Sequence, residues 1–192
     1  RNTIEGFKIS SKFVEFFNRN ELIINHEYKG VFHLKVDDNY TQVLSTFKHN
    51  EIDKGLYSSI AKLDDRILYA YDKGIFHLDQ KEDKFVKDST LSSLSYNEDN
   101  YSSGKLITNN SNSLWTFTNK GINYISPSKL SSQYQSLFIP IPSHVRNAMI
   151  GYENIQKLQE NTFLFGNSQG YLIFNLDELE STKDSFTFSL DQ

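Results

Sequence analysis

The chain has no cysteine among its 192 residues, which excludes disulfide bonds, thiol catalysis and cysteine-based zinc sites. No apolar run approaches the ~18 residues that a membrane-spanning helix requires. Basic residues are scattered, and a net charge of −4 argues against nucleic acid as the main partner of this segment. Glycine-rich phosphate loops are also missing. These absences remove thiol, nucleotide-phosphate and nucleic-acid chemistry from the candidate functions.

Aromatic residues, by contrast, are abundant: 15 phenylalanines and 11 tyrosines bring the aromatic fraction to 14% together with the single tryptophan. Aromatic and β-branched side chains favour strands. They recur here in short runs between polar stretches rich in Asn, Asp, Ser and Lys, and the chain has only 3 prolines. This pattern predicts an all-β fold.

Four stretches of the sequence can be aligned with one another, each an apolar strand, a polar turn that ends in glycine, and a second apolar strand. These stretches are residues 21–37, 66–80, 113–127 and 162–177. Their shared turn glycines, which follow one another at intervals of 44, 47 and 49 residues, are Gly30, Gly74, Gly121 and Gly170. We expect each glycine to supply a positive φ or a close approach in a hairpin. A period of about 40–50 residues with several strands per unit is typical of a β-propeller.

Further strand-like runs complete each repeat. A first strand is predicted before each pair, at residues 12–17, 58–63, 104–109 and 153–158, and a fourth strand after three of the pairs, at 41–47, 84–88 and 136–141. The sequence therefore predicts about four propeller blades of four antiparallel strands within residues 1–183, at approximately 10–47, 58–88, 104–141 and 152–180.

Four blades seldom close a ring, and the chain begins at an arginine. We therefore interpret it as a processed or excised part of a larger propeller. An open arc, or an oligomer that completes the ring, is the alternative. An open arc would leave strand edges and blade faces unprotected.

The motif GNSQG at residues 166–170 has the G-x-S-x-G pattern of the nucleophile elbow of serine hydrolases. An elbow requires a helix after the turn, whereas the sequence that follows Gly170 is strand-like. No histidine follows Ser168 to complete a triad. Paired carboxylates elsewhere fall at predicted turns, where solvated acidic residues are common. We therefore expect no catalytic residue and no enzyme activity.

Two histidines invite a metal interpretation, because His33 and His77 both lie three residues after a turn glycine. The same place in the last repeat is held by Ile173, which cannot bind a metal. A packing position is the favoured interpretation, and the sequence predicts neither a metal nor a cofactor. The neighbouring run of His26, Glu27 and Tyr28 is interpreted as a solvated hairpin tip in preference to a ligand contact.

The loops between repeats are better candidates for a binding site. Residues 48–57, 89–103 and 142–152 should gather, with the hairpin turns, on one face around a propeller channel. Their tyrosines would suit stacking on a sugar, and an arginine could bind a carboxylate. The candidate ligand-binding residues are Tyr57, Tyr101, His144, Arg146, Asn147 and Tyr152. The alternative is that these loops are plain connectors.

The runs SSIAKLDD and SLWTFTNKGINYIS carry a family resemblance. They resemble the two-component-regulator-propeller repeats of Bacteroidetes-type bacterial transcriptional regulators and hybrid histidine kinases. Trp115 and Gly121 stand where that family keeps its Trp and Gly, and the resemblance covers roughly residues 10–180. It implies a periplasmic sensor region joined through a three-Tyr immunoglobulin-like domain and a membrane helix to a cytoplasmic output domain. Residues 184–192 resemble the first strand of that linking domain.

The expected function is therefore a non-catalytic, extracytoplasmic ligand-sensing segment of a regulator of signal transduction and transcription. The expected partners are a small-molecule or oligosaccharide ligand, the other domains of the same regulator and, as an option, further copies of the chain. We expect no direct nucleic-acid contact, and a membrane link only through other parts of the full-length protein. The alternatives are a propeller glycosidase or polysaccharide lyase, and a generic protein-interaction propeller.

Overall fold

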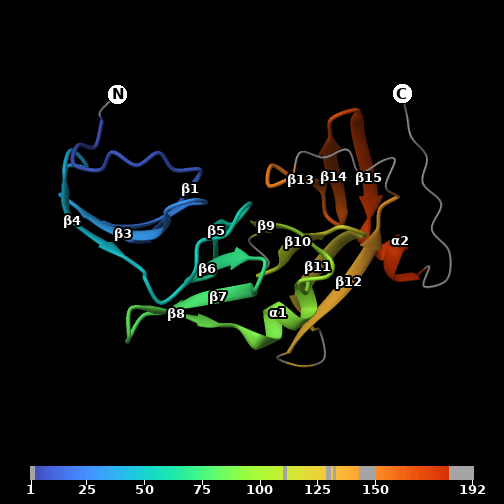
Figure 1. Cartoon of the computed structure of the whole chain (residues 1–192). Coiled ribbons are helices and arrows are strands. Elements are labelled where there is room, and N and C mark those ends of the chain that lie inside the picture. The colour runs from blue at the N-terminus through green and yellow to red at the C-terminus, as the bar shows by residue number, and fades with distance from the viewer. Residues whose placement is uncertain (1–2, 110–111, 129–130, 132, 143–149, 182–192) are drawn as a thin grey trace.

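The structure is a computed structural model, and it describes residues 3–109, 112–128, 131, 133–142 and 150–181. These residues form fifteen strands and two short helices (Figure 1). The strands make four separate antiparallel sheets that follow one another along the chain. The all-β class predicted from the sequence is confirmed.

The first three sheets each have four strands in chain order. The first sheet contains β1 (Phe13–Asn18), β2 (Glu21–His26), β3 (Gly30–Val36) and β4 (Val43–Lys48). The second contains β5 (Ser59–Leu63), β6 (Arg66–Tyr71), β7 (Gly74–Asp79) and β8 (Lys84–Lys87). The third contains β9 (Tyr101–Thr108), β10 (Leu114–Thr118), β11 (Gly121–Pro127) and β12 (Tyr134–Pro140). Each strand predicted for these repeats overlaps an observed strand.

The last sheet differs from the prediction of four strands per repeat. Within the described residues it has three strands, β13 (Asn154–Gln159), β14 (Thr162–Asn167) and β15 (Gly170–Asn175). The chain then turns into α2 (Leu176–Ser181), with the Asn175 side chain accepting a hydrogen bond from the Asp177 backbone at 2.9 Å. This side-chain contact gives the backbone an alternative to the hydrogen bonds of a sheet, and the strand ends at Asn175.

A helix, α1 (Ser89–Ser95), occupies the start of residues 89–103, which the sequence predicted to be a loop between repeats. The Asp88 side chain caps it by accepting from the Leu91 backbone at 2.9 Å. Leu91 is fully buried, and the Ser92 hydroxyl exchanges hydrogen bonds with the backbone of Ile75. Packing on the second and third sheets, rather than helix propensity, stabilises this helix.

Each sheet packs on the next through its own apolar core. Ile23 and Val31 of the first sheet join Ile60 and Tyr69 of the second. A second core unites the second and third sheets, and a third unites the third sheet with the fourth. In the last of these, Trp115 is buried with its ring 4.5 Å from Tyr124 and 4.9 Å from Phe163.

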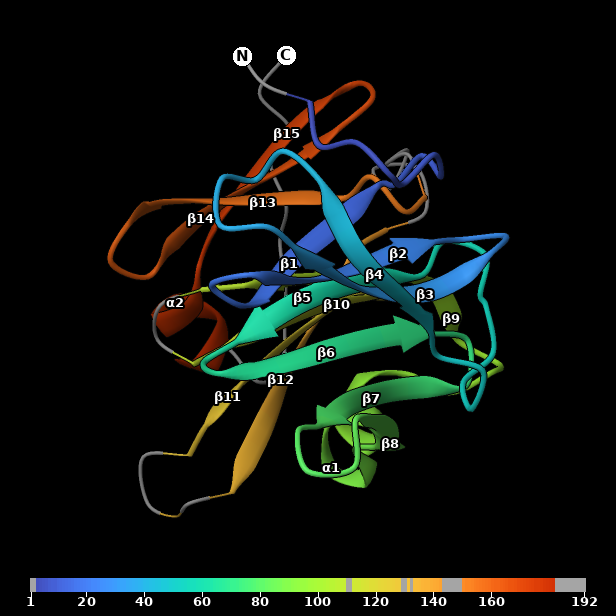
Figure 2. The ribbon, with the colours of Figure 1, turned by 90° about the vertical axis from the view of Figure 1, so that its left-hand side faces the viewer.

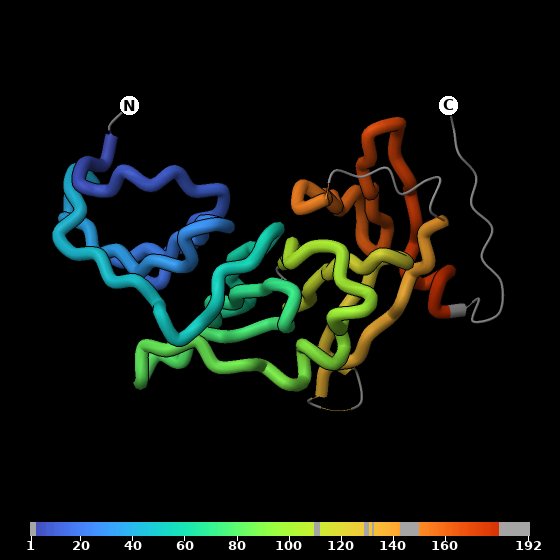
Figure 3. Tube along the Cα trace, viewed as in Figure 1, coloured from blue at the N-terminus to red at the C-terminus, as the bar shows by residue number. Residues whose placement is uncertain are grey.

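The first strands of successive sheets lie side by side. β1 lies beside β5, and β5 lies beside β9. The sheets consequently fan out from their first strands, and the chain passes from the first sheet through the second and third to the fourth (Figures 1 and 3). The view turned by 90° shows β1 beside β5 (Figure 2).

Three of the four predicted turn glycines have a structural reason, and one does not. Gly30 and Gly74 adopt positive φ values of 97° and 120°. Gly121 has no positive φ, but a Cβ there would collide with the Ile139 carbonyl oxygen. Gly170 has no positive φ, and a Cβ there would meet no other atom of the described residues within 4 Å. The requirement for glycine at position 170 was therefore wrong.

Candidate functional site

One end of the first strands brings together residues that are distant in the sequence. Lys12 precedes β1, Tyr57 precedes β5, Tyr101 begins β9, and Tyr152 precedes β13. The turn between β2 and β3 reaches the same end, because Lys12 donates a hydrogen bond to Glu27 at 3.2 Å. The antiparallel order of each sheet explains this arrangement, since the start of a first strand and the turn after the second strand share one edge.

Lys12 links the first sheet to the fourth. Its Nζ lies 3.6 Å from the ring centroid of Tyr152, the geometry of a cation–π contact. The same Nζ forms the ion pair with Glu27. The Tyr152 side chain remains 62% exposed, so one face of its ring is open to a ligand.

A hollow of about 320 Å³ lies between these groups. Its lining residues are Ser10, Ser11, Lys12, His26, Glu27, Tyr28 and Tyr152. Tyr28 is 66% exposed, so the hollow has an open tyrosine on the first sheet and another before the fourth. Hydroxyl, ammonium and carboxylate groups between two open rings can bind a ligand that has flat apolar faces and many hydroxyls.

A buried acid lies next to this hollow in sequence and near the first strands in space. Glu153 is 6% exposed, and its Oε1 accepts a hydrogen bond from the Ser103 hydroxyl at 2.8 Å. Its Oε2 is buried and has no hydrogen-bond partner within the described part of the chain. Burial raises the pKa of Glu153, because desolvation disfavours the carboxylate.

Burial also shifts the pKa of Lys105 on β9, but in the opposite direction. Burial lowers the pKa of Lys105, and the nearby charge of Lys12 lowers it further. Its Nζ also lies 4.3 Å from the ring centroid of Phe13. Titratable groups whose environments favour their neutral forms gather at functional sites more often than elsewhere.

The structure places the residues predicted from the sequence unevenly. Tyr152 lines the hollow. Tyr57 lies beside it, since a Cβ on Gly151 would approach the Tyr57 ring within 3.1 Å and the Lys12 Nζ within 3.2 Å. Tyr101 is instead turned toward the loop between β4 and β5, where its hydroxyl donates to the Leu56 carbonyl at 2.9 Å. Burial raises the pKa of Tyr101, which keeps this hydroxyl a donor.

The remaining predicted residues, His144, Arg146 and Asn147, lie outside the described residues. Sequence reasoning in turn missed Lys12 and gave Tyr28 and Glu27 the role of a solvated hairpin tip. The available signal was positional: the second-to-third-strand turn of the first repeat belongs to the same face as the loops between repeats.

Two other sequence features resolve differently. Ser168 lies in the turn between β14 and β15, and strand β15 follows it rather than a helix. The backbone of a nucleophile elbow is therefore not formed at this motif.

A second cluster, formed by His33, His49 and Asp83 between the first two sheets, holds groups that could bind a metal ion.

Comparison with known proteins supports the fold and nothing finer. No protein-family model matches the chain, and no curated protein matches it. Among solved structures it resembles the crystal structure of the extracellular domain of a proposed one-component system from B. thetaiotaomicron, with a TM-score of 0.54 and 13% sequence identity. The likeness covers 86% of this chain but only 22% of that one. The chain therefore spans about a fifth of the length of the protein that it matches.

The two helices within the described residues are short, and neither is long and apolar enough to cross a membrane.

Proposed function

We propose that this chain is a non-catalytic ligand-binding segment of the extracytoplasmic, periplasmic sensor region of a bacterial transcriptional regulator. The observation that carries the proposal is the hollow beside the first strands, with Tyr28 and Tyr152 open on its two sides and Lys12 between them. The fold likeness to an extracellular domain of a one-component system supports the location and the sensory role.

The four sheets are, in this proposal, consecutive blades of a propeller that contains more blades. Their chain order and the side-by-side first strands support this arrangement. The fourth sheet offers a further argument. Its Phe163 and Phe174 pack on the third sheet, whereas Tyr171 and Ile173 on its other face are 47% and 56% exposed. An apolar outer face of this kind suits the packing of another blade.

An oligosaccharide is the proposed ligand class. Sugar rings present apolar faces to aromatic side chains and hydroxyls to polar ones, and the hollow supplies both kinds of group. Lys12 is already paired with Glu27, so the pair can donate to and accept from hydroxyls without a net charge in the site. This neutral pairing favours an uncharged sugar over a polyanion.

The test is a binding measurement with a panel of defined oligosaccharides, by calorimetry and ligand-observed NMR. We expect binding by the unmodified chain and a loss of about 10-fold or more in affinity for Tyr152→Ala and Tyr28→Ala, because about 1.4 kcal/mol of stacking corresponds to 10-fold. Tyr171→Ala is the matched control, since it removes an exposed tyrosine on β15 outside the hollow.

The same samples test the absence of catalysis. Incubation with each bound oligosaccharide should release no shorter sugar, whereas turnover that Glu153→Gln abolishes would establish an enzyme instead. Equal affinities for the unmodified chain, Tyr152→Ala and Tyr28→Ala would place the ligand elsewhere.

A further inference from the structure

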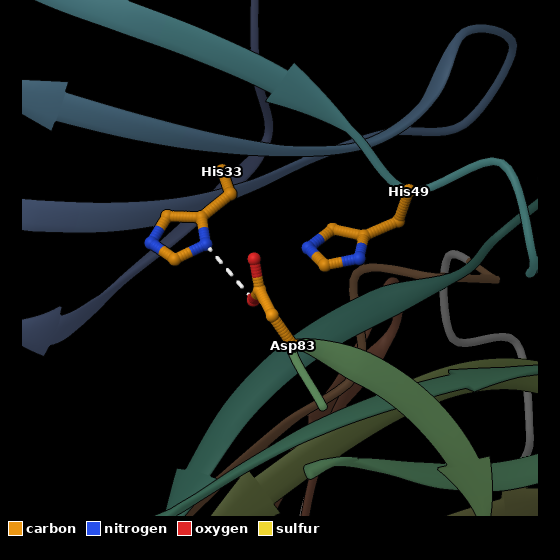
Figure 4. Close-up of side chains that lie close together, drawn as sticks. All are labelled: His33, His49 and Asp83. Carbon is orange, nitrogen blue, oxygen red and sulfur yellow. Dashed lines mark hydrogen bonds and ion pairs between the residues drawn. The ribbon is translucent and has the colours of Figure 1, made fainter. Parts of the chain in front are cut away.

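Two histidines and an aspartate from three different elements meet between the first and second sheets. His33 lies on β3, His49 follows β4 directly, and Asp83 lies in the turn between β7 and β8 (Figure 4). One nitrogen of each ring and a carboxylate oxygen of Asp83 all lie within 4.8 Å of one another. The two imidazole rings are nearly parallel, with an interplanar angle of 12°.

His49 has an unused ring nitrogen that is directed into this cluster. Its side chain is fully buried, and its Nδ1 lies 2.9 Å from the Glu51 carboxylate. The Nδ1 proton is therefore held by Glu51, which leaves Nε2 with a free lone pair. This Nε2 is buried, has no hydrogen-bond partner among the described residues, and faces the space between His33 and Asp83 (Figure 4). An unpartnered buried nitrogen is costly unless something binds it.

His33 completes a similar arrangement. Its Nδ1 lies 3.2 Å from Asp83 Oδ1, and its Nε2 lies 3.6 Å from the Glu21 carboxylate. Each histidine thus has one nitrogen directed into the cluster. The other nitrogen of His49 is hydrogen-bonded to a carboxylate, whereas the Glu21 carboxylate lies near the other nitrogen of His33 but beyond hydrogen-bond distance. Metal-binding histidines characteristically have such an outer carboxylate, which fixes the ring and raises its basicity.

Three aromatic rings also lie against the two histidines. The Phe17 ring lies 5.4 Å from His33, and the rings of Phe47 and Phe85 lie 5.1 Å and 5.0 Å from His49. Aromatic side chains around the site limit the access of water to the imidazole nitrogens, while Asp83, whose side chain is 50% exposed, leaves a way in from solvent.

We propose that His33, His49 and Asp83 bind one divalent transition-metal cation, with Zn²⁺ as the best fit, and that this ion ties the first sheet to the second. Two imidazoles and one carboxylate are a ligand set that Zn²⁺ accepts, with the fourth position left to water. A chain without cysteine must build such a site from these groups. Zinc ligands around a tetrahedral ion are roughly 3.4 Å apart. The three groups lie within 4.8 Å of one another, so they need to approach by at most about 1.4 Å. Asp83 can supply that movement from its exposed turn.

The sequence predicts no metal, because the place of His33 and His77 in the repeat is held by Ile173 in the last repeat. The structure places His33 beside His49 instead, and the equivalent place directly after the fourth strand is held by Asp88 and Ile141 in the next two sheets. A site between two sheets need not follow the repeat, since its ligands come from different positions in each. This inference stands independently of the proposed sugar-binding function.

The test begins with metal-free, untagged protein titrated with Zn²⁺ by calorimetry and with Co²⁺ by visible absorption. We expect one ion per chain, a Co²⁺ spectrum of the intense tetrahedral type, and a Tm that rises with Zn²⁺ concentration because the ion binds only the folded state.

The variants divide into ligands, a positioning residue and controls. Asp83→Asn and His49→Gln should each weaken Zn²⁺ binding at least 10-fold, and the exposed position of Asp83 makes its variant safe for folding. Glu51→Gln should weaken binding by about 10-fold to 100-fold through the orientation of His49. The controls are Glu82→Gln, which removes a charge from the same turn, and His77→Gln, which removes a histidine from the equivalent strand position. Both should bind Zn²⁺ as the unmodified chain does.

Absence of stoichiometric Zn²⁺ and Co²⁺ binding by the unmodified chain would overturn the proposal. So would Asp83→Asn and His49→Gln proteins that bind as tightly as the unmodified chain, since other groups would then hold the ion. If Glu82→Gln lost as much Zn²⁺ affinity as Asp83→Asn, the loss in Asp83→Asn would reflect surface charge and not a metal ligand.

Discussion

At the scale of single residues, Glu153 determines a pH dependence of stability. Burial raises the pKa of Glu153 in the folded protein above its ordinary value near 4.5. As the pH rises past that ordinary value, the unfolded chain loses this proton before the folded chain does. Ionisation therefore favours the unfolded state, and this contribution to stability falls as the pH rises toward the folded pKa.

Glu153→Gln should remove this loss, because a glutamine keeps an oxygen for the Ser103 hydroxyl without a charge. We expect a gain of roughly 1 kcal/mol at pH 7 and little change at pH 4. For a chain of this size the gain corresponds to about 2–4 °C in Tm. Thermal unfolding of both proteins from pH 4 to pH 8 measures it, with the exposed Glu98→Gln as control. Parallel pH profiles for the unmodified and Glu153→Gln proteins would show that Glu153 ionises without penalty.

At the scale of hairpins, two glycines that look equivalent in the repeat make opposite predictions. A side chain at Gly121 would meet the Ile139 carbonyl and the Phe138 ring, whereas one at Gly170 would meet nothing within 4 Å. We expect Gly121→Val to cost about 1–3 kcal/mol through overpacking. Gly170→Val should stay within about 0.5 kcal/mol, as surface substitutions do. Urea unfolding followed by circular dichroism measures both, and equal midpoints for the two variants would contradict this distinction.

The strands were predictable because each has a short aromatic or β-branched run between polar turns. α1 was not, because its sequence STLSSLS contains four serines and only two apolar residues. Serines compete for backbone hydrogen bonds and weaken helices. The helix is stabilised by tertiary contacts that the sequence does not show. Leu91 enters the core between the second and third sheets, and the Ser92 hydroxyl accepts a hydrogen bond from the Ile75 backbone.

The sequence predicted on which face of the sheets the candidate site lies better than it predicted which residues form the site. The alternation of strand direction in each repeat indicated that loops and second turns share a face, and Tyr57 and Tyr152 do lie there together. Lys12 could not be chosen in advance, because its value comes from a contact with Tyr152 across 140 residues of chain. His49 is similar, since its burial and its orientation by Glu51 arise only from the packing of two sheets.

At the scale of the whole molecule, the outer face of the fourth sheet determines how the isolated chain behaves. Leu158, Tyr171 and Ile173 are each about half exposed on strands β13 and β15. If a further blade normally covers this face, the isolated chain should associate through it, because a contiguous apolar surface is removed from water on contact. We expect the mass measured by light scattering to rise with protein concentration.

Leu158→Lys with Ile173→Lys should keep the chain monomeric over the same concentrations, since two charges on that face oppose its burial. Leu44→Lys on β4 of the first sheet is the control, because Leu44 is 59% exposed at the opposite end of the sheet series. It should associate as the unmodified chain does if the fourth sheet provides the contact. An unmodified chain that is monomeric at every concentration would instead mean that its four sheets need no further blade, and the proposed larger ring would lose the support of this apolar face.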